Sequence, residues 1–267
     1  MQREAPSRVD RRQLGHLAVE IDQMDIENDL TEPRTKIGNI ANKLRLIVTA
    51  TLVGIHAGCR SFADMERMTA NLSASARKLL HLTGRVADTS ASDVIVRLNV
   101  NELRNVLRKR ILAALRGKRL QPDFPLGVVS LDGKGTGTFL HDPEGAKVPC
   151  AQINAETGKA VVRTITACLV STPARPCIDM HPVPKENNEM STFAAVLDAL
   201  LGAYARKLFQ VVMYDAGAVS LANACEVIKR SLDYVFVLNA NQPTLLAEAT
   251  RLLGSKALDT AQSKTTD

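Results

Sequence analysis

The chain has 267 residues and 45% hydrophobic content, which suits one large domain or two modest ones and excludes an intrinsically disordered protein. Its net charge of +6 is uneven: residues 1–120 carry 21 Lys and Arg against 13 Asp and Glu, whereas residues 121–267 carry 13 against 15. The basic first half predicts contact with a polyanion, although a solvated basic surface explains the charge equally well. Aromatic residues make up only 3%, which argues against base stacking as the mode of binding.

Cysteine usage and hydropathy indicate a cytoplasmic protein with no membrane partner. The longest apolar stretch, residues 44–58, is interrupted and too short to span a bilayer, so a core helix is expected there. The N-terminus has no apolar signal region. The cysteines form no CxxC pair, which indicates neither a disulfide framework nor a zinc site. They are Cys59, Cys150, Cys168, Cys177 and Cys225.

The first 120 residues are predicted to be helical. Residues 1–35 are polar and form a mobile lead or a loosely packed helix. Helices are expected over 38–57, 61–70 with Ser61 as N-cap, and 74–82, with one or two more in 89–115. Together they define a basic, DNA-binding type of domain over residues 36–120. Within the last segment the candidate DNA-binding residues are Arg104, Arg108, Lys109 and Arg110.

After a charged, proline-containing linker at 116–125 the pattern changes to alternating strands and helices. Strands are expected at 126–132, twice within 148–170, at 208–215 and at 233–240. Helices are expected at 189–205, 219–231 and 244–254, before a polar tail at 255–267. This order predicts an α/β domain over 126–254, with parallel strands joined by right-handed crossovers.

Two predicted strands each end in an aspartate. Asp132 follows "VVSL" and Asp215 follows "FQVVMY". Functional groups in open α/β sheets gather beyond the carboxyl ends of the strands, so we expect the two carboxylates to be neighbours. Such a pair suits Mg²⁺ or Mn²⁺ and in-line phosphoryl transfer on a phosphodiester. Ordinary turn chemistry explains either aspartate alone.

At these residues the chain resembles the ISAs1 family of insertion-sequence transposases. "VVSLDGK", "KENNEMSTFAAVLDAL" and "VVMYDAGAVSLANACEVIKRSLDYVFVLNANQPTLL" are similar to its catalytic domain, and "RTKIGNIANKLRLIVTATLVGIHAGCRSFADMERM" to its helical domain. The resemblance covers roughly residues 30–253. It implies a ribonuclease-H-like mixed sheet with flanking helices after an all-α domain, and a DDE site with Asp132 and Asp215 as the first two acids. It also implies metal-dependent cleavage and transfer of double-stranded DNA at element ends by a homo-oligomer.

The chain departs from that family in three places. The family's third acid, a glutamate in a Trp-Xaa-Ile-Glu-Asn type motif, has no counterpart, because there is no Trp and the chain stops soon after "RLLG". We therefore expect a decayed, frameshifted or truncated C-terminal end. Asn239 stands where the family tends to have Lys, and "GTGTFL" follows Lys134. Glu189 matches a family position and is a weaker candidate metal ligand, although a first-turn glutamate that stabilises a helix N-terminus is as good an explanation.

"GKGTG" at 133–137 lacks the Walker spacing, so we interpret it as a hairpin turn rather than a nucleotide-binding loop, with Lys134 able to contact a DNA phosphate. Three functions stay open. The chain is a DNA transposase, a catalytically inactive DNA-binding remnant of one, or an unrelated α/β phosphohydrolase.

Overall fold

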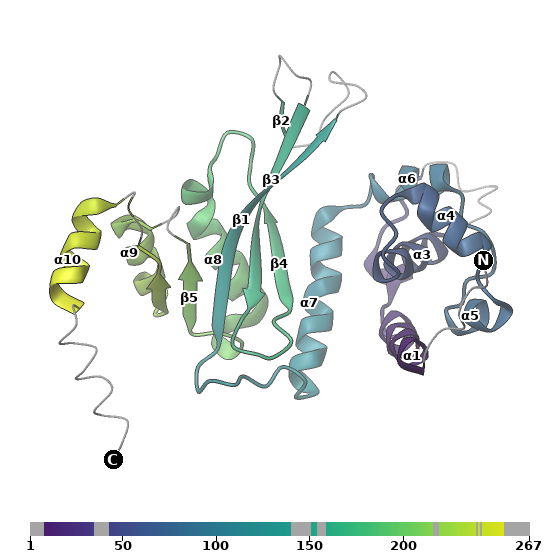
Figure 1. Cartoon of the computed structure of the whole chain (residues 1–267), viewed down its shortest axis with the longest axis horizontal. Coiled ribbons are helices and arrows are strands. Elements are labelled where there is room, and N and C mark those ends of the chain that lie inside the picture. The colour runs from purple at the N-terminus through teal and green to yellow at the C-terminus, as the bar shows by residue number, and fades with distance from the viewer. Residues whose placement is uncertain are drawn as a thin grey trace. The chain divides into compact units, whose positions relative to one another are not determined.

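The structure is a computed structural model that describes residues 8–34, 43–139, 151–153, 159–215, 219–238, 240 and 242–253. The chain divides into two compact units, residues 1–110 and 111–267 (Figure 1). The division falls within helix α7 (Val100–Arg116). The assignment of DNA binding to the first half and catalysis to the second stays a prediction.

The first unit is helical. Besides the start of α7 it contains α1 (Arg8–Asp22), α2 (Ile26–Asp29), α3 (Leu44–His56), α4 (Phe62–Ala70), α5 (Ala74–Leu79) and α6 (Asp88–Ile95). Ala18 and Ile21 of α1 are buried in the same apolar cluster as Ile47 and Val53 of α3. Residues 8–30 are therefore a packed part of this unit and not a loose lead. Residues 1–7 and 35–42, where part of the predicted 38–57 helix falls, lie outside the described residues.

Local capping chemistry sets the start of α4, as the sequence predicts. The Ser61 side chain accepts a hydrogen bond of 3.1 Å from the backbone N–H of Asp64. Such a cap satisfies one of the N–H groups that have no partner within the first helical turn. In the part of the chain that the structure describes, no helix is both long and apolar enough to cross a membrane.

The second unit is built on a mixed sheet. Its strands are β1 (Val128–Phe139), β2 (Ala151–Ile153), β3 (Lys159–Leu169), β4 (Cys177–Pro182), β5 (Val211–Tyr214) and β6 (Asp233–Phe236). β3 pairs antiparallel with β1 on one edge and with β2 and β4 on the other, while β1, β5 and β6 run parallel. The helical elements are α8 (Glu189–Tyr204), a short 3₁₀ turn η1 (Ala205–Lys207), α9 (Leu221–Lys229) and α10 (Pro243–Leu253). This mixed sheet with flanking helices confirms the predicted ribonuclease-H-like α/β class.

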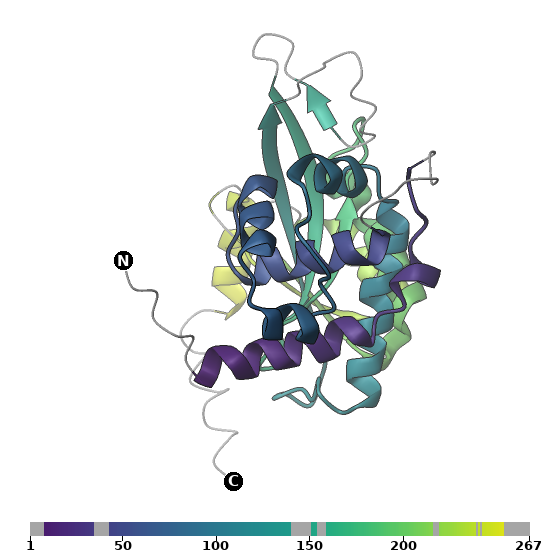
Figure 2. The ribbon, with the colours of Figure 1, turned by 90° about the vertical axis from the view of Figure 1, so that its right-hand side faces the viewer.

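Two details of the sheet correct the sequence prediction. β1 does not end at Asp132 but continues to Phe139, so residues 133–137 are strand and not a hairpin turn. The reason is that β3 pairs with β1 over its whole further length, as the long neighbouring strands in Figure 2 show, and this satisfies the backbone of "GKGTG". The strand β4 was also not predicted.

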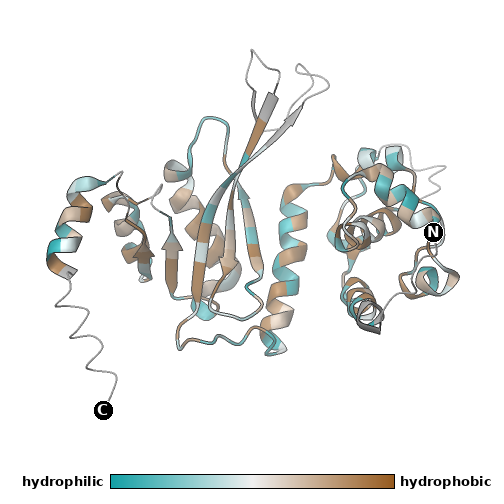
Figure 3. Cartoon of the chain, in the orientation of Figure 1, coloured by the Kyte–Doolittle hydropathy of each residue, from teal (hydrophilic) through white to brown (hydrophobic). Residues whose placement is uncertain are grey.

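Helix α8 covers one face of the sheet. Phe193 and Leu197 are fully buried, and the Phe193 ring stacks on Tyr214 of β5 with 5.4 Å between ring centroids. Figure 3 shows β5 as mostly hydrophobic, as expected for a short strand enclosed by its neighbours. Strand pairing within the sheet and stacking on α8 therefore both fix the position of Tyr214, the residue immediately before Asp215.

Candidate functional site

The two aspartates predicted to be neighbours follow the last residue pair of two adjacent parallel strands. β1 and β5 pair from Val128–Val211 to Leu131–Tyr214, and Asp132 and Asp215 are the next residues. Neighbouring strands lie about 4.8 Å apart, so Asp132 and Asp215 occupy adjacent backbone positions. The predicted pairing of these strands is confirmed. Asp132 itself lies inside β1, opposite Thr166 of β3.

The Asp132 carboxylate is open to solvent and faces a cation on its own strand. Its side chain is 56% exposed, and Lys134 Nζ lies 3.8 Å from its Oδ2. Residues two apart in a strand share a face, which explains the contact. An ion pair this exposed contributes little stability, so Lys134 is available to another anion.

A third carboxylate approaches from α8. Glu189 is the first residue of that helix, which begins with a capping box between Asn188 and Ser191. A Cβ atom placed on Gly133 would lie 2.0 Å from Glu189 Cδ and 2.1 Å from its Oε2. Only a residue without a side chain leaves room for the Glu189 carboxylate beside β1.

Asp132 and Gly133, as consecutive residues of β1, point to opposite faces of the strand. Val129 and Leu131 of β1 are buried, on the face that Gly133 shares because side chains alternate along a strand. Asp132 projects from the opposite face. Among the described residues no three His, Cys, Asp or Glu side chains form a group able to hold a metal ion. Asp132 and Asp215 supply the hard oxygen donors that Mg²⁺ and Mn²⁺ prefer, and the role of Glu189 as a weaker ligand stays a prediction.

Two buried hydroxyl groups, those of Tyr214 and Thr166, were not predicted from the sequence. Tyr214 is 1% exposed, and its hydroxyl has no hydrogen-bond partner among the described residues. Burial, followed by the negative charges of Glu189, Asp215 and Asp132, raises the pKa of Tyr214. The phenol therefore stays protonated at neutral pH and can donate a hydrogen bond.

Thr166 is the second of these hydroxyl groups. It is buried in β3 directly opposite Asp132, and its Oγ1 has no partner in the described part of the chain. Directly opposed residues of an antiparallel pair share a face of the sheet. In the sequence Thr166 alternates with Ile165 and Ala167, a pattern that predicts an exposed side chain, so its burial could not be predicted.

Two of the predicted DNA-binding cations of α7 are engaged within the first unit. Lys109 pairs with Asp29 of α2, and Arg110 pairs with Glu20 of α1 and also donates to Gln23 Oε1 at 3.0 Å. Arg104 and Arg108 are not free of partners either. The uncompensated charge of this segment is therefore lower than its composition indicates, and its role in DNA binding stays a prediction.

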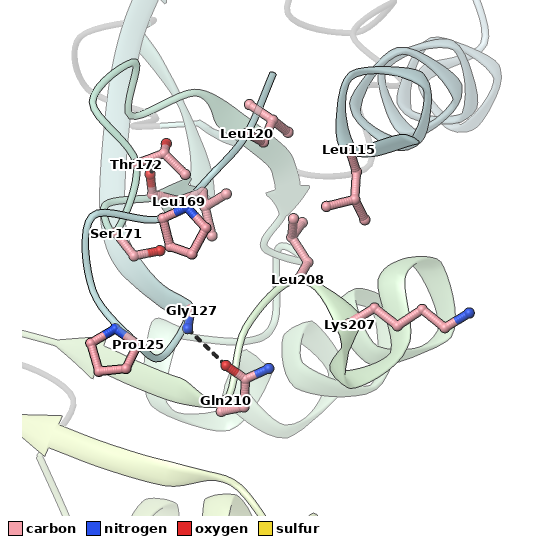
Figure 4. A pocket seen from close by; sticks show the side chains of 11 residues that line it. Leu115, Leu120, Pro125, Gly127, Leu169, Ser171, Thr172, Lys207, Leu208 and Gln210 are labelled. Atoms are coloured by element: carbon pink, nitrogen blue, oxygen red, sulfur yellow. Dashed lines mark hydrogen bonds between the residues drawn. The ribbon is translucent and has the colours of Figure 1, made fainter. Parts of the chain in front are cut away.

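The opposite end of the β1–β5 pair holds a cavity. It has a volume of about 210 Å³ and a lining of mixed polarity, with the leucines Leu115, Leu120, Leu169 and Leu208 beside Ser171, Thr172, Lys207 and Gln210 (Figure 4). Gly127 N–H donates to Gln210 Oε1 at 2.7 Å across its floor. No acidic side chain is among the residues that line this cavity.

Comparison with known proteins shows only distant structural similarity. No protein-family model matches the chain, and no curated protein matches it. Among solved structures, the chain is similar to a piggyBac transposase determined by cryo-electron microscopy as a synaptic complex with hairpin DNA. The TM-score is 0.40 and the identity 13%, and the match covers 90% of this chain and 54% of that one. The chain thus spans about half the length of that transposase, and a likeness this distant carries no function across.

Proposed function

We propose that the chain is a transposase-type DNA-processing protein of the ISAs1 kind, in which Asp132 and Asp215 hold a divalent cation against a DNA phosphodiester. The observation that supports this most is the parallel register that starts both aspartates from adjacent backbone positions. Two neighbouring carboxylates repel each other unless a cation or proton lies between them. The pair is therefore better suited to a cation than to a structural role.

The residues around the pair fit a phosphodiester substrate. A bound Mg²⁺ or Mn²⁺ would act as a Lewis acid on the phosphate oxygens. Lys134, on the same face of β1 as Asp132, is placed to bind a phosphate oxygen. Thr166 has its hydroxyl at the strand position opposite Asp132. The basic first half would bind the DNA backbone through its phosphates.

A second candidate function is DNA binding without cleavage. It is favoured by the absence of a three-carboxylate group among the described residues. A hard cation with few protein ligands keeps more of its waters and is held loosely. A reacting group misplaced by about 1 Å loses on the order of 100-fold in rate. Both candidates therefore predict weak metal binding, but the first predicts slow cleavage and the second predicts none.

One set of measurements separates the two candidates. Mn²⁺ binding is followed by calorimetry, and nicking of supercoiled plasmid is followed on gels, for the chain and for an Asp132→Ala, Asp215→Ala double variant. We expect the double variant to bind Mn²⁺ about tenfold more weakly or worse, a loss of about 1.4 kcal/mol. Asp233→Ala is the matched control, since Asp233 is an exposed acid at the start of β6.

Slow nicking that disappears only in the double variant supports the transposase. DNA binding with no nicking in any variant supports the second candidate, and its log affinity should fall with log salt by about 0.9 for each phosphate neutralised. Mn²⁺ binding that is equal in the chain and in the double variant would exclude a cation site at Asp132 and Asp215. An absence of DNA binding would exclude both functions.

A further inference from the structure

Two of the cysteines that show no pairing in the sequence are direct partners across the sheet. Cys168 of β3 and Cys177 of β4 stand opposite each other in the antiparallel ladder. In Figure 1 these strands run side by side in the second unit. Both thiols are partly exposed, so a small reagent in solvent can reach them.

The hydrogen bonds of the ladder show which type of pair this is. At the next position Leu169 N–H donates to the Pro176 carbonyl at 2.9 Å, which makes Leu169 and Pro176 a hydrogen-bonded pair. Pair types alternate along antiparallel strands, so Cys168 and Cys177 form a non-hydrogen-bonded pair, in which Cα atoms lie about 4.5 Å apart. Disulfides need Cα separations of about 4.4–6.8 Å. The usual separation of a non-hydrogen-bonded pair falls within that range.

The local structure fixes this register. A bulge lies between the Ala167–Asp179 and Cys168–Cys177 pairs, which leaves Ile178 as the extra residue of β4. Ile178 is buried, and its carbonyl accepts a hydrogen bond of 2.7 Å from the Tyr204 hydroxyl of α8. The burial of Ile178 and its hydrogen bond from Tyr204 therefore hold β4 in this register, with the two cysteines opposite each other.

The two thiols also contact each other. Burial and the neighbouring Cys168 thiol raise the pKa of Cys177, and Cys177 Sγ donates to the Asp179 carbonyl at 3.3 Å. Cys177 therefore stays a thiol at neutral pH, held beside Cys168 by its own hydrogen bond. This arrangement suits a resolving cysteine, which reacts after its partner has been oxidised.

We propose that Cys168 and Cys177 form a reversible cross-strand disulfide when the protein meets a hydroperoxide. In the first step Cys168 sulfur attacks the peroxide O–O bond, giving a sulfenic acid and one water from hydrogen peroxide. In the second step Cys177 sulfur attacks that sulfur, the S–S bond forms and a second water leaves. The two sulfurs supply the two electrons that reduce the peroxide, and a dithiol reverses the reaction.

This site is independent of the proposed function but lies close to it. Cys168 pairs on its other side with Ser130 of β1, two residues before Asp132. A disulfide here would fasten β4 to the strand that pairs with the aspartate-bearing strand. It would close a loop of residues 168–177, which restricts the unfolded chain and should raise the thermal midpoint.

The test uses the full chain, reduced and then treated with hydrogen peroxide. Both cysteines fall in one tryptic peptide, residues 164–185, because Arg175 precedes a proline. We expect this peptide to lose two hydrogens in mass and to become resistant to alkylation, and dithiothreitol to restore both thiols. Cys168→Ser and Cys177→Ser should each abolish the loss, whereas Cys150→Ser and Cys225→Ser, the matched controls, should retain it.

The wild-type peptide decides the outcome even if a serine variant fails to fold. The proposal is overturned if this peptide keeps two alkylatable thiols while other cysteines oxidise. It is equally overturned if the peptide gains oxygen atoms instead of losing hydrogens, or if Cys168 or Cys177 becomes linked to a second chain. Failure of dithiothreitol to restore the thiols would exclude reversibility.

Discussion

Gly127 and Gly133 stand at the two ends of the stretch where β1 pairs with β5, and each lacks room for a side chain. A Cβ on Gly127 would lie 2.2 Å from the backbone oxygen of Leu208 and 2.8 Å from the Cα of Phe209. A Cβ on Gly133 would lie 2.0 Å from the carboxylate end of Glu189. The atoms that a Cβ on Gly127 would meet belong to the backbone, which hydrogen bonds hold in place. The atoms that a Cβ on Gly133 would meet are the end of the flexible Glu189 side chain.

The two ends of the β1–β5 pair therefore differ. The amino end is enclosed by backbone, and we call it the structural end. The carboxyl end is lined by side chains that can move, and we call it the adaptable end. At the amino end, the Gly127 carbonyl accepts from Gln210 N–H at 2.9 Å and from Val211 N–H at 3.1 Å, so β1 and β5 are joined with no room to adjust. At the carboxyl end, Asp132 and Lys134 are exposed, and Glu189 can rotate about its own side-chain bonds. A site that must accept a cation or a phosphate needs such freedom, and this end alone provides it.

The largest effect is expected at the structural end. Gly127→Ala forces the new methyl group into the Leu208 carbonyl, and the strands must separate to relieve the clash. We expect a loss of about 3 kcal/mol in the free energy of unfolding, in the upper range for overpacking. Urea unfolding followed by circular dichroism measures it.

Gly202→Ala is the matched control, because a Cβ at that position in α8 meets nothing within 4 Å. Alanine is the better helix former, so this variant should gain about 0.5–1 kcal/mol. A Gly127→Ala protein as stable as the wild type would show that the amino end adjusts after all.

A smaller effect is expected from the buried hydroxyl beside the carboxylates. Tyr214→Phe keeps the ring that stacks on Phe193 and removes an unpartnered polar group, so it should gain about 1 kcal/mol at pH 7. Because the folded state raises the pKa of Tyr214 above its ordinary value of 10.0, the unfolded chain ionises first. The wild type should therefore lose stability above pH 10 by up to about 1.4 kcal/mol per pH unit more than the variant.

Paired urea titrations of the two proteins at pH 7 and above pH 10 isolate this tyrosine, since all other titrating groups are shared. Parallel losses of stability in the wild type and Tyr214→Phe would contradict a raised pKa at this position.

The smallest effect is expected at the adaptable end. Gly133→Ala should change the free energy of unfolding by no more than about 0.5 kcal/mol, because Glu189 swings away and alanine restricts the unfolded chain. In a Glu189→Ala background the same substitution meets no carboxylate and should stabilise by about 0.5–1 kcal/mol. A double-mutant cycle gives the coupling. A loss of 2 kcal/mol or more from Gly133→Ala alone would mean that Glu189 is held rigidly.

Features governed by near neighbours in the chain could be predicted from the sequence. The Ser61 cap, most of the helices and the α/β order of the second unit follow from capping chemistry and hydrophobic periodicity, which act over a few residues. The adjacency of Asp132 and Asp215 could also be predicted, because apolar runs that end in an acid and alternate with helices leave few topologies.

Contacts between distant segments were decided by the tertiary structure alone. Pairing with β3 carries β1 past Asp132 and places Thr166 opposite it, and α8 brings Glu189 against Gly133. The ion pairs of Lys109 and Arg110 join helices about 80–90 residues apart in the chain. Cys168 and Cys177 became partners through a bulge and an alternation of hydrogen-bonded pairs that no residue pattern encodes. Strand register depends on the summed packing of both partners, so it exists only once the sheet has formed.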